Sequence, residues 1–257
     1  MALRLELDPE FADGYRSPAQ RARRMTEGWF ARNMYCPACD SPRLAATRDN
    51  TRVVDFICPG CGAEFQLKAK RGSFGRKVVD AAYAPMVQRA RENRSPHFAF
   101  LGYDSIYWRV SRLLLVPGHF ITPDVIERRK ALRKSARRAG WVGCNLLLER
   151  VPPDGRVGVV CENAVVPPES VRAQWARYEW LSGTRPEQRT WTVDVLRCVR
   201  SLGKSEFTLA EVYSFEEELA ASHPKNRHVR DKIRQQLQVL RDKGVLEFLG
   251  GGRYLLL

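Results

Sequence analysis

The chain has 257 residues, 44% of them hydrophobic and 28% charged, which suffices for one sizeable core and leaves room for two domains. Its formal net charge of +14 points to a polyanionic partner, with nucleic acid as the first candidate. The sequence has no apolar run long enough to span a membrane, no secretory signal, no nucleotide-binding fingerprint and no Ser or Cys triad, so we expect a cytoplasmic protein outside those classes.

The first predicted element is a helix that starts at Ser17-Pro18, where an N-cap residue is followed by proline at the first helical position. It leads to two Cys-x-x-Cys motifs, Cys36/Cys39 and Cys58/Cys61, which are separated by 18 residues. This spacing is typical of a zinc ribbon whose four thiolates close a tetrahedral, structural Zn²⁺ site. Two disulfides or inert thiols are the alternative.

The residues on both sides of the second cysteine motif predict a strand pair, Arg52–Ile57 and Glu64–Ala69, because both are rich in β-branched and aromatic residues. Asp55 lies inside the apolar run of the first strand, where a buried carboxylate is costly unless a cation or a donor meets it. Alternation places Gln66 and Lys68 together on the polar face of the second strand. The three residues are similar to the Asp…(Glu/Asp/Gln)-x-Lys pattern of the PD-(D/E)XK nucleases, although a surface hairpin with one satisfied aspartate gives the same pattern.

The middle of the chain alternates between helical and strand patterns. The expected elements are a helix over Val78–Arg91 kinked at Pro85, strands over His97–Tyr103 and Tyr107–Val116, a helix capped by Thr122-Pro123, a strand over Gly155–Cys161 and a helix near Glu169–Leu181. Strands layered with helices are expected of an α/β nuclease core, to which we assign residues 1–182.

A basic stretch, Arg128–Arg138, carries seven basic residues and no acidic one. Such a run is either a solvated face or a segment that follows DNA phosphates. Trp141 comes next, between glycines and close to Arg137 and Arg138. It either belongs to the core or contacts a base or a methyl group.

The C-terminal part, residues 190–257, follows a polar stretch, Ser182–Arg189, that we interpret as a linker. The pattern predicts three helices and a hairpin, the order of a winged helix. The elements are a helix over Trp191–Val199, a helix with a capping box at Thr208, a helix from Asn226 to Gly244, and strands over Val245–Phe248 and Tyr254–Leu256.

The third of these helices presents a polar side that is suited to the DNA major groove. Its candidate DNA-binding residues are Arg227, His228, Arg234 and Gln235, with Arg253 on the wing reaching a phosphate or the minor groove. A solvated helix or a protein-binding winged helix is the alternative.

Several segments closely resemble the DpnI-type restriction endonucleases, in the same order over nearly the whole chain. These segments are YCPAC, VVDFICPGC, EFQLKAK, SARRAGWVGCN, SEFTL and DKIRQQLQVLRDKG. The resemblance implies an α/β fold, namely a PD-(D/E)XK restriction-endonuclease-like core with a zinc-ribbon insertion, followed by a winged-helix domain. It also implies a monomer that cleaves double-stranded DNA at G-A-T-C sites containing N6-methyladenine, with both domains reading the methyl group.

Position by position, the resemblance assigns the catalytic roles to Asp55, Gln66 and Lys68, with the carbonyl of Leu67 as a further Mg²⁺ ligand, and methyl reading to Trp141. The family has glutamate where this chain has Gln66. The site therefore loses one negative charge, and we expect a higher Mg²⁺ or Mn²⁺ requirement unless Glu64 supplies the missing carboxylate. The alternative is a weak or inactive reader of methylated DNA.

Overall fold

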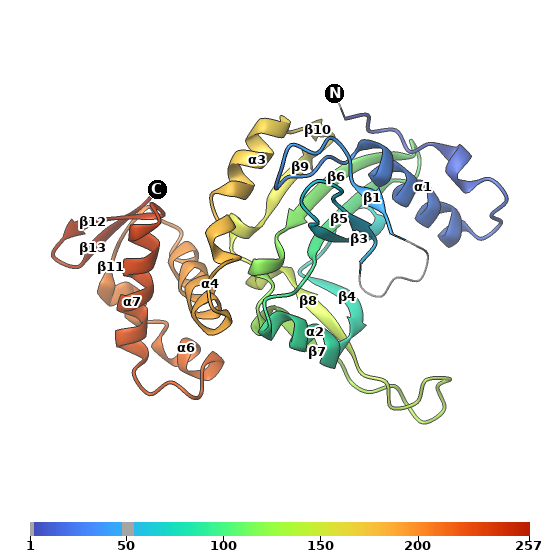
Figure 1. Ribbon diagram of the computed structural model, residues 1–257. Coiled ribbons are helices and arrows are strands. Elements are labelled where there is room, and N and C mark those ends of the chain that lie inside the picture. Colours follow the sequence, from blue (N-terminus) through green and yellow to red (C-terminus); the bar gives the residue numbers. More distant parts are fainter. Residues whose placement is uncertain (1–2, 48–53) are drawn as a thin grey trace.

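The computed structural model of the chain describes residues 3–47 and 54–257 (Figure 1). The first two residues of the predicted strand Arg52–Ile57 lie outside the described residues. The remainder of that prediction corresponds to a short strand, β2, and the second predicted strand corresponds to β3, which is longer than expected.

A mixed sheet forms the centre of the N-terminal domain, in the order β1-β2-β3-β5-β6-β9-β10. Its strands are β1 (Ala45–Ala46), β2 (Phe56–Ile57), β3 (Glu64–Arg71), β5 (His97–Asp104), β6 (Arg109–Val116), β9 (Val157–Cys161) and β10 (Ala164–Val165). β3 and β5 run parallel, whereas the other neighbours are antiparallel. The strands predicted at His97–Tyr103, Tyr107–Val116 and Gly155–Cys161 are thus confirmed.

A smaller antiparallel sheet has the order β4-β8-β7 and consists of β4 (Lys77–Ala82), β8 (Gly143–Leu147) and β7 (Ile126–Arg128). The helix predicted over Val78–Arg91 is wrong in its first half. Val78 and Asp80 are buried while Val79 is exposed, the alternation of a strand, and only Tyr83–Arg91 forms the helix α2. Pro85 does not interrupt α2, because it lies in the first turn of the helix, where a backbone N–H has no intrahelical partner.

Thr122-Pro123 opens only a single 3₁₀ turn, η3 (Pro123–Val125), and not the predicted helix. The chain passes directly from this turn into β7. The helix predicted near Glu169–Leu181 is divided into α3 (Pro168–Ala176) and the 3₁₀ turn η6 (Glu179–Leu181).

Two apolar cores lie on the two faces of the central sheet. One core joins the sheet to α1 (Pro18–Asn33) and α3, and it is centred on Trp29, Phe65 and Trp175. The other core joins the sheet to α2, the smaller sheet and the C-terminal domain. The nuclease-like core is therefore layered between helices, as the sequence predicts.

The C-terminal domain is a winged helix. Its elements are α4 (Pro186–Ser201), β11 (Glu206–Thr208), α5 (Leu209–Tyr213), α6 (Glu216–Ser222), α7 (Val229–Asp242), β12 (Leu246–Gly250) and β13 (Arg253–Leu256). The capping box at Thr208 is confirmed. Two elements were not predicted, the strand β11 and the helix α6, and α7 has His228 rather than Asn226 at its N-cap. Asn226 instead accepts the backbone N–H of His228 at 2.7 Å.

The winged helix packs against the N-terminal domain through α4. This helix begins at Pro186 and so includes the second half of the stretch interpreted as a linker. Arg189 is fully buried and donates hydrogen bonds to the carbonyl of Ala90 and the side chain of Asn93. Within the described residues, none of the helices combines the length and apolar character that a membrane span needs.

Candidate active site and metal centre

The four cysteines of the two Cys-x-x-Cys motifs meet at one point. All four sulfurs lie within 4.8 Å of one another, with Cys36 Sγ 3.7 Å from Cys61 Sγ and Cys39 Sγ 3.5 Å from Cys58 Sγ. Tetrahedral zinc with Zn–S bonds of about 2.3 Å requires sulfurs roughly 3.8 Å apart. The cluster therefore fits a closed, structural zinc site.

Backbone hydrogen bonds shape the second cysteine motif into the turn between β2 and β3. The N–H of Cys58 donates to Ala63 O at 2.9 Å, and the N–H of Gly62 donates to Cys58 O at 2.9 Å. Gly62 has a φ of +74°, which glycine adopts without strain. At the first cysteine motif, Arg172 of α3 donates to the carbonyls of both Cys36 and Cys39. The cysteine cluster is thus connected directly to the segment that carries the candidate catalytic residues.

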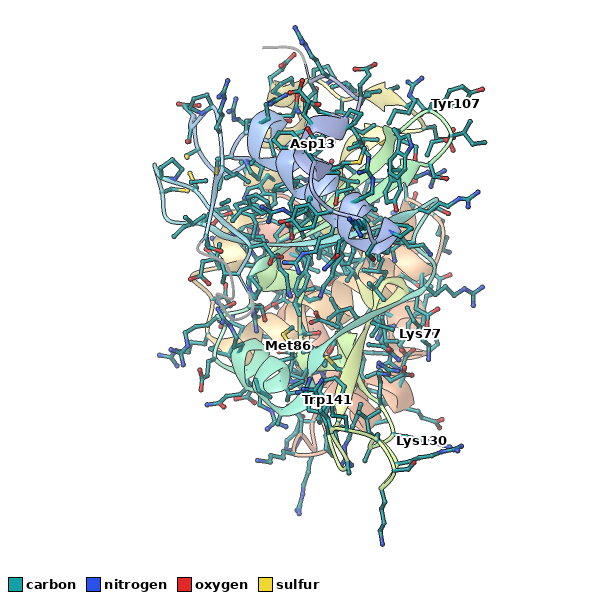
Figure 2. All side chains as sticks on the ribbon, turned by 90° about the vertical axis from the view of Figure 1, so that its right-hand side faces the viewer. Asp13, Lys77, Met86, Tyr107, Lys130 and Trp141 are labelled. Atoms are coloured by element: carbon teal, nitrogen blue, oxygen red, sulfur yellow. The ribbon has the colours of Figure 1, made fainter. Side chains whose placement is uncertain are left out.

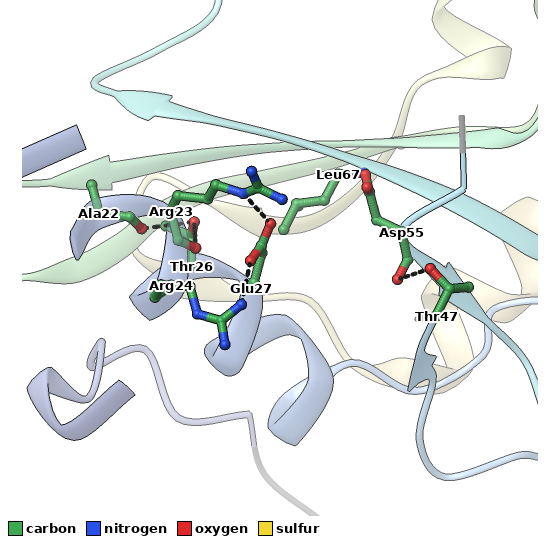
Figure 3. Close-up of polar contacts among 8 residues, drawn as sticks. All are labelled: Ala22, Arg23, Arg24, Thr26, Glu27, Thr47, Asp55 and Leu67. Atoms are coloured by element: carbon green, nitrogen blue, oxygen red, sulfur yellow. Dashed lines mark hydrogen bonds and ion pairs between the residues drawn. The ribbon is translucent and has the colours of Figure 1, made fainter. Parts of the chain in front are cut away.

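Asp55 lies immediately before β2 and extends the pairing of β2 with β3 through its side chain. The backbone N–H of Asp55 donates to Phe65 O at 2.9 Å. Its Oδ2 accepts the N–H of Leu67 at 2.8 Å, and Figure 3 shows these two residues. Burial raises the pKa of Asp55, while the Leu67 N–H and the nearby charge of Lys68 act in the opposite direction. The carboxylate is therefore partly desolvated and lies within electrostatic range of Lys68.

Gln66 and Leu67 offer two further oxygen atoms. Gln66 is 8% exposed, and its Oε1 is buried without a hydrogen-bond partner among the described residues. In an antiparallel ladder, the N–H and the C=O of one residue point toward the same neighbouring strand. The N–H of Leu67 points toward Asp55, so the Leu67 carbonyl lies on the Asp55 side of β3 as well. A carboxylate, an orphaned amide oxygen and a backbone carbonyl are a donor set that Mg²⁺ accepts. These residues fit a magnesium ion.

Lys68 forms an ion pair that the sequence analysis did not predict. Its ammonium binds Oδ1 of Asp80 on β4, with the Lys68 side chain 20% exposed and the Asp80 side chain fully buried. Burial, and next the charge of Asp80, raises the pKa of the neighbouring Cys144 thiol to about 12. Asp80 therefore lies in a poorly solvated environment directly behind the lysine.

A cleft of about 630 Å³ opens over these residues. Its polar lining residues are Arg23, Thr26, Glu27, Asp55, Gln66, Lys68 and Tyr103. Glu27 is a second residue that the sequence analysis missed. It extends from α1 between Arg23, at 2.7 Å, and Arg24, at 3.7 Å, and its charge contributes to the raised pKa of Asp55 (Figure 3).

Glu64, which the sequence analysis considered as a source of the missing carboxylate, faces another part of the surface. Its Oε2 binds the guanidinium of Arg89 on α2 at 2.9 Å, and it lines a separate cleft that also includes His97. Its position does not support a role beside Asp55.

The basic stretch Arg128–Arg138 extends the β7–β8 pair as a projecting hairpin (Figure 1). Its two arms are joined by hydrogen bonds from Leu132 N–H to Trp141 O, at 2.9 Å, and from Arg129 N–H to Gly143 O, at 3.0 Å. All seven basic side chains are exposed. Figure 2 shows Lys130 and Trp141 at the same end of the molecule.

Trp141 lies at the base of this hairpin and is neither fully buried nor fully exposed. The guanidinium of Arg138 lies 4.7 Å from the centre of its ring. A Cβ at position 143 would come within 2.7 Å of the indole, so Gly143 is what allows the ring to lie against β8. The indole is thus held beside the basic hairpin.

The candidate residues of the winged helix lie on the exposed surface of α7 and of the wing. Arg227 lies in the turn before α7 and His228 is the N-cap residue of α7, whereas Arg234 and Gln235 lie on α7 itself; all four side chains are exposed. Arg234 is paired with Asp231, and Arg253 lies 3.4 Å from Glu206. These residues belong to a surface separate from the Asp55 cleft.

The chain combines an α/β core with a C-terminal winged helix, and the core places Asp55, Gln66 and Lys68 next to a four-cysteine cluster. This combination defines the class of restriction-endonuclease-like proteins with an added DNA-binding domain. Residues 3–184 match the DpnI family, described as the Dam-replacing family, and residues 187–255 match the DpnI_C family, described as the Dam-replacing HTH domain. The chain belongs to the DpnI family. It is accordingly a DNA-binding protein of a restriction-type family.

Proposed function

We propose that the protein is a methyl-dependent endonuclease that cuts double-stranded DNA at G-A-T-C sites containing N6-methyladenine. The observation that supports this most is the convergence of Asp55, Gln66, Leu67 and Lys68 in one cleft of a chain that belongs to the DpnI family.

In this proposal, Asp55, the Gln66 amide oxygen and the Leu67 carbonyl hold Mg²⁺. When bound, Mg²⁺ lowers the pKa of a coordinated water and offsets the charge that builds up on the scissile phosphate. Lys68 orients the attacking water and stabilises the developing negative charge. No covalent intermediate is required.

Glutamine at position 66 has a consequence for metal affinity. It keeps an oxygen ligand but removes one negative charge, so Mg²⁺ binds more weakly than to a site with two carboxylates. Glu27, the one acidic residue of α1, lines the same cleft, and its charge acts on Asp55.

Two surfaces hold the DNA in this proposal. The basic hairpin, with Arg137 and Arg138, follows the phosphates, and Trp141 contacts the methyl group. On the winged helix, α7 reads base edges in the major groove and Arg253 contacts the DNA backbone.

The proposed domains are residues 1–182 and 190–257. Because α4 begins at Pro186, a fragment that contains the second domain should start at Pro186.

The test is a cleavage assay on plasmid with and without N6-methyladenine in G-A-T-C, with Mg²⁺ and separately with Mn²⁺. We expect fragments from the methylated plasmid alone. The loss of a carboxylate at Gln66 favours a second candidate, a reader without catalytic activity. Methyl-specific binding without cleavage in either metal would support that reader.

A further inference from the structure

Lys68 and Asp80 come from different sheets, yet their charges meet behind the cleft. Lys68 belongs to β3 of the central sheet and Asp80 to β4 of the smaller sheet, twelve residues further along the chain. The Asp80 side chain is fully buried and that of Lys68 is 20% exposed. The pair is therefore not a surface ion pair, whose contribution would be small.

Asp80 has no other cation to offset its charge among the contacts of the described residues. Its Oδ2 is buried without a hydrogen-bond partner there. Its neighbour Cys144 uses its thiol to donate to Ala81 O, at 3.4 Å. A buried carboxylate with a single cationic partner is costly unless that partner stays in place. The cost of separating them restrains the Lys68 ammonium on the Asp80 side of the cleft.

The backbone at Asp80 departs from regular pairing. The register of β4 on β8 shifts between Val79 and Ala82, so Asp80 lies within an irregularity of the ladder. Bulges of this kind occur next to active sites, where they aim a side chain. Here the inward-facing side chain of the irregular segment is the one that meets Lys68.

The charges of the site give the pair a second role. The formal charges of Asp55, Gln66 and Lys68 sum to zero because residue 66 is an amide. With glutamate at position 66 the same three residues would carry one negative charge. Adding Asp80 restores that single negative charge. The Lys68 ammonium would otherwise repel a divalent cation held by Asp55.

We propose that Asp80 is a positioning residue for Lys68: its buried carboxylate holds the ammonium at the cleft and supplies the negative charge that glutamine at position 66 lacks. This inference rests on the proposed function, since it concerns the same site. Asp80 does not line the cleft and acts through Lys68, without contact to DNA or metal.

The first experiment measures single-turnover cleavage of a methylated duplex in Mg²⁺ by the full chain and its variants. Asp80→Asn should cut at least tenfold more slowly, while its DNA affinity in Ca²⁺ stays within about twofold of the unmodified protein. In the Lys68→Met background, Asp80→Asn should cause no further loss. Asp194→Asn serves as the control, because Asp194 is also buried and paired, with His223 at 2.8 Å, outside both proposed sites.

The second experiment does not depend on cleavage. Lys68→Met leaves the Asp80 charge buried and unpaired, so its denaturation midpoint should fall, and adding Asp80→Asn should recover part of that fall. Strictly additive midpoint shifts, or wild-type cleavage by Asp80→Asn, would overturn the inference. If the unmodified protein cuts no DNA in either metal, the proposed function fails, and the midpoints still decide whether Asp80 restrains Lys68.

Discussion

The guanidinium of Arg200 in α4 binds the carboxylate of Asp154 in the N-terminal domain, with Nε 2.7 Å from Oδ2 and a second bond to Oδ1. The hydroxyl of Tyr178 donates to the same carboxylate. The Asp154 side chain is 3% exposed. This bidentate contact, together with the shared apolar core, fixes the winged helix against the nuclease-like domain.

Asp154→Asn should therefore destabilise the protein, because it leaves the Arg200 guanidinium partly buried and without its carboxylate. We expect the free energy of unfolding to fall by roughly 3 kcal/mol in urea denaturation. Asp242→Asn is the matched control, since Asp242 pairs with Arg241 on the surface, and it should change the stability by less than about 1 kcal/mol. Equal effects of the two substitutions would mean that the Asp154 pair does not fix the two domains together.

Purified protein should contain one zinc ion per chain, held by Cys36, Cys39, Cys58 and Cys61. Cys61→Ser should lose the zinc and, because the same turn connects the strands around Asp55 and Gln66, lower both stability and cleavage. Cys161→Ser is the control, as it removes an exposed cysteine outside the cluster. Metal analysis by mass spectrometry checks the stoichiometry. Cleavage by zinc-free protein would contradict the structural role.

Asp55→Ala and Lys68→Ala should each reduce cleavage by at least a hundredfold while leaving DNA affinity nearly unchanged, because these residues hold the metal and the nucleophile. A hundredfold loss corresponds to about 2.7 kcal/mol of transition-state stabilisation. Lys70→Ala, two positions further on the same strand and exposed, should cut normally. Gln66→Glu should lower the Mg²⁺ concentration needed for half-maximal cleavage. Wild-type cleavage by Asp55→Ala would show that the site is assigned wrongly.

The comparison of Asp55 with Asp80 shows how far the sequence could predict the site. Both aspartates follow two valines in an apolar run, VVDF and VVDA, so the same argument about a costly buried carboxylate applies to both. Asp55 could be identified because a Lys-containing strand follows it in the chain. Asp80 could not be identified from the sequence, because the residues of β4 and α2 follow each other directly and together have a helical pattern.

The fold shows a similar limit. The winged helix, the cysteine cluster and the main strands depend on local signals such as the capping box at Thr208 and glycine-rich turns, and these could be predicted. Glu27 and the docking of Arg189 depend on which elements pack together in space, and no local pattern contains that information. The short strand β11 is defined only by its pairing with β13.

The capping box gives a pH-dependent prediction. The pKa of Glu211 is lowered to about 2, foremost by its hydrogen bond with Lys204 and then by those with the N–H and the hydroxyl of Thr208. A carboxylate with a lowered folded-state pKa stabilises the fold above its unfolded pKa, and that contribution is lost as the pH falls toward 2. Glu211→Gln should thus be less stable than the unmodified protein at pH 7, and the difference should shrink between pH 5 and pH 3. Denaturation midpoints across this range check it, with Glu247→Gln on β12 as the control. A difference that stays constant with pH would exclude the charge of Glu211 as the cause.

The last prediction separates base reading from phosphate contact in the winged helix. Gln235 is exposed on α7, and a bidentate side-chain contact to a base contributes about 1–3 kcal/mol of discrimination between bases. Gln235→Ala should therefore weaken binding to methylated G-A-T-C and leave binding to unrelated duplexes unchanged. Arg253→Ala should weaken binding to all duplexes and reduce the slope of log affinity against log salt by about one. Lys225→Ala, in the exposed turn before α7, is the matched control for loss of a nearby charge.

These affinities are measured in Ca²⁺ with the full chain, at two salt concentrations, on methylated, unmethylated and unrelated duplexes. One buried methyl group contributes about 1 kcal/mol, so the preference for methylated DNA that the winged helix adds should be modest, roughly tenfold per methyl group. If Gln235→Ala and Arg253→Ala lower the affinity for all three duplexes alike, the winged helix contributes only charge. The reading of the methyl group then belongs to the region around Trp141.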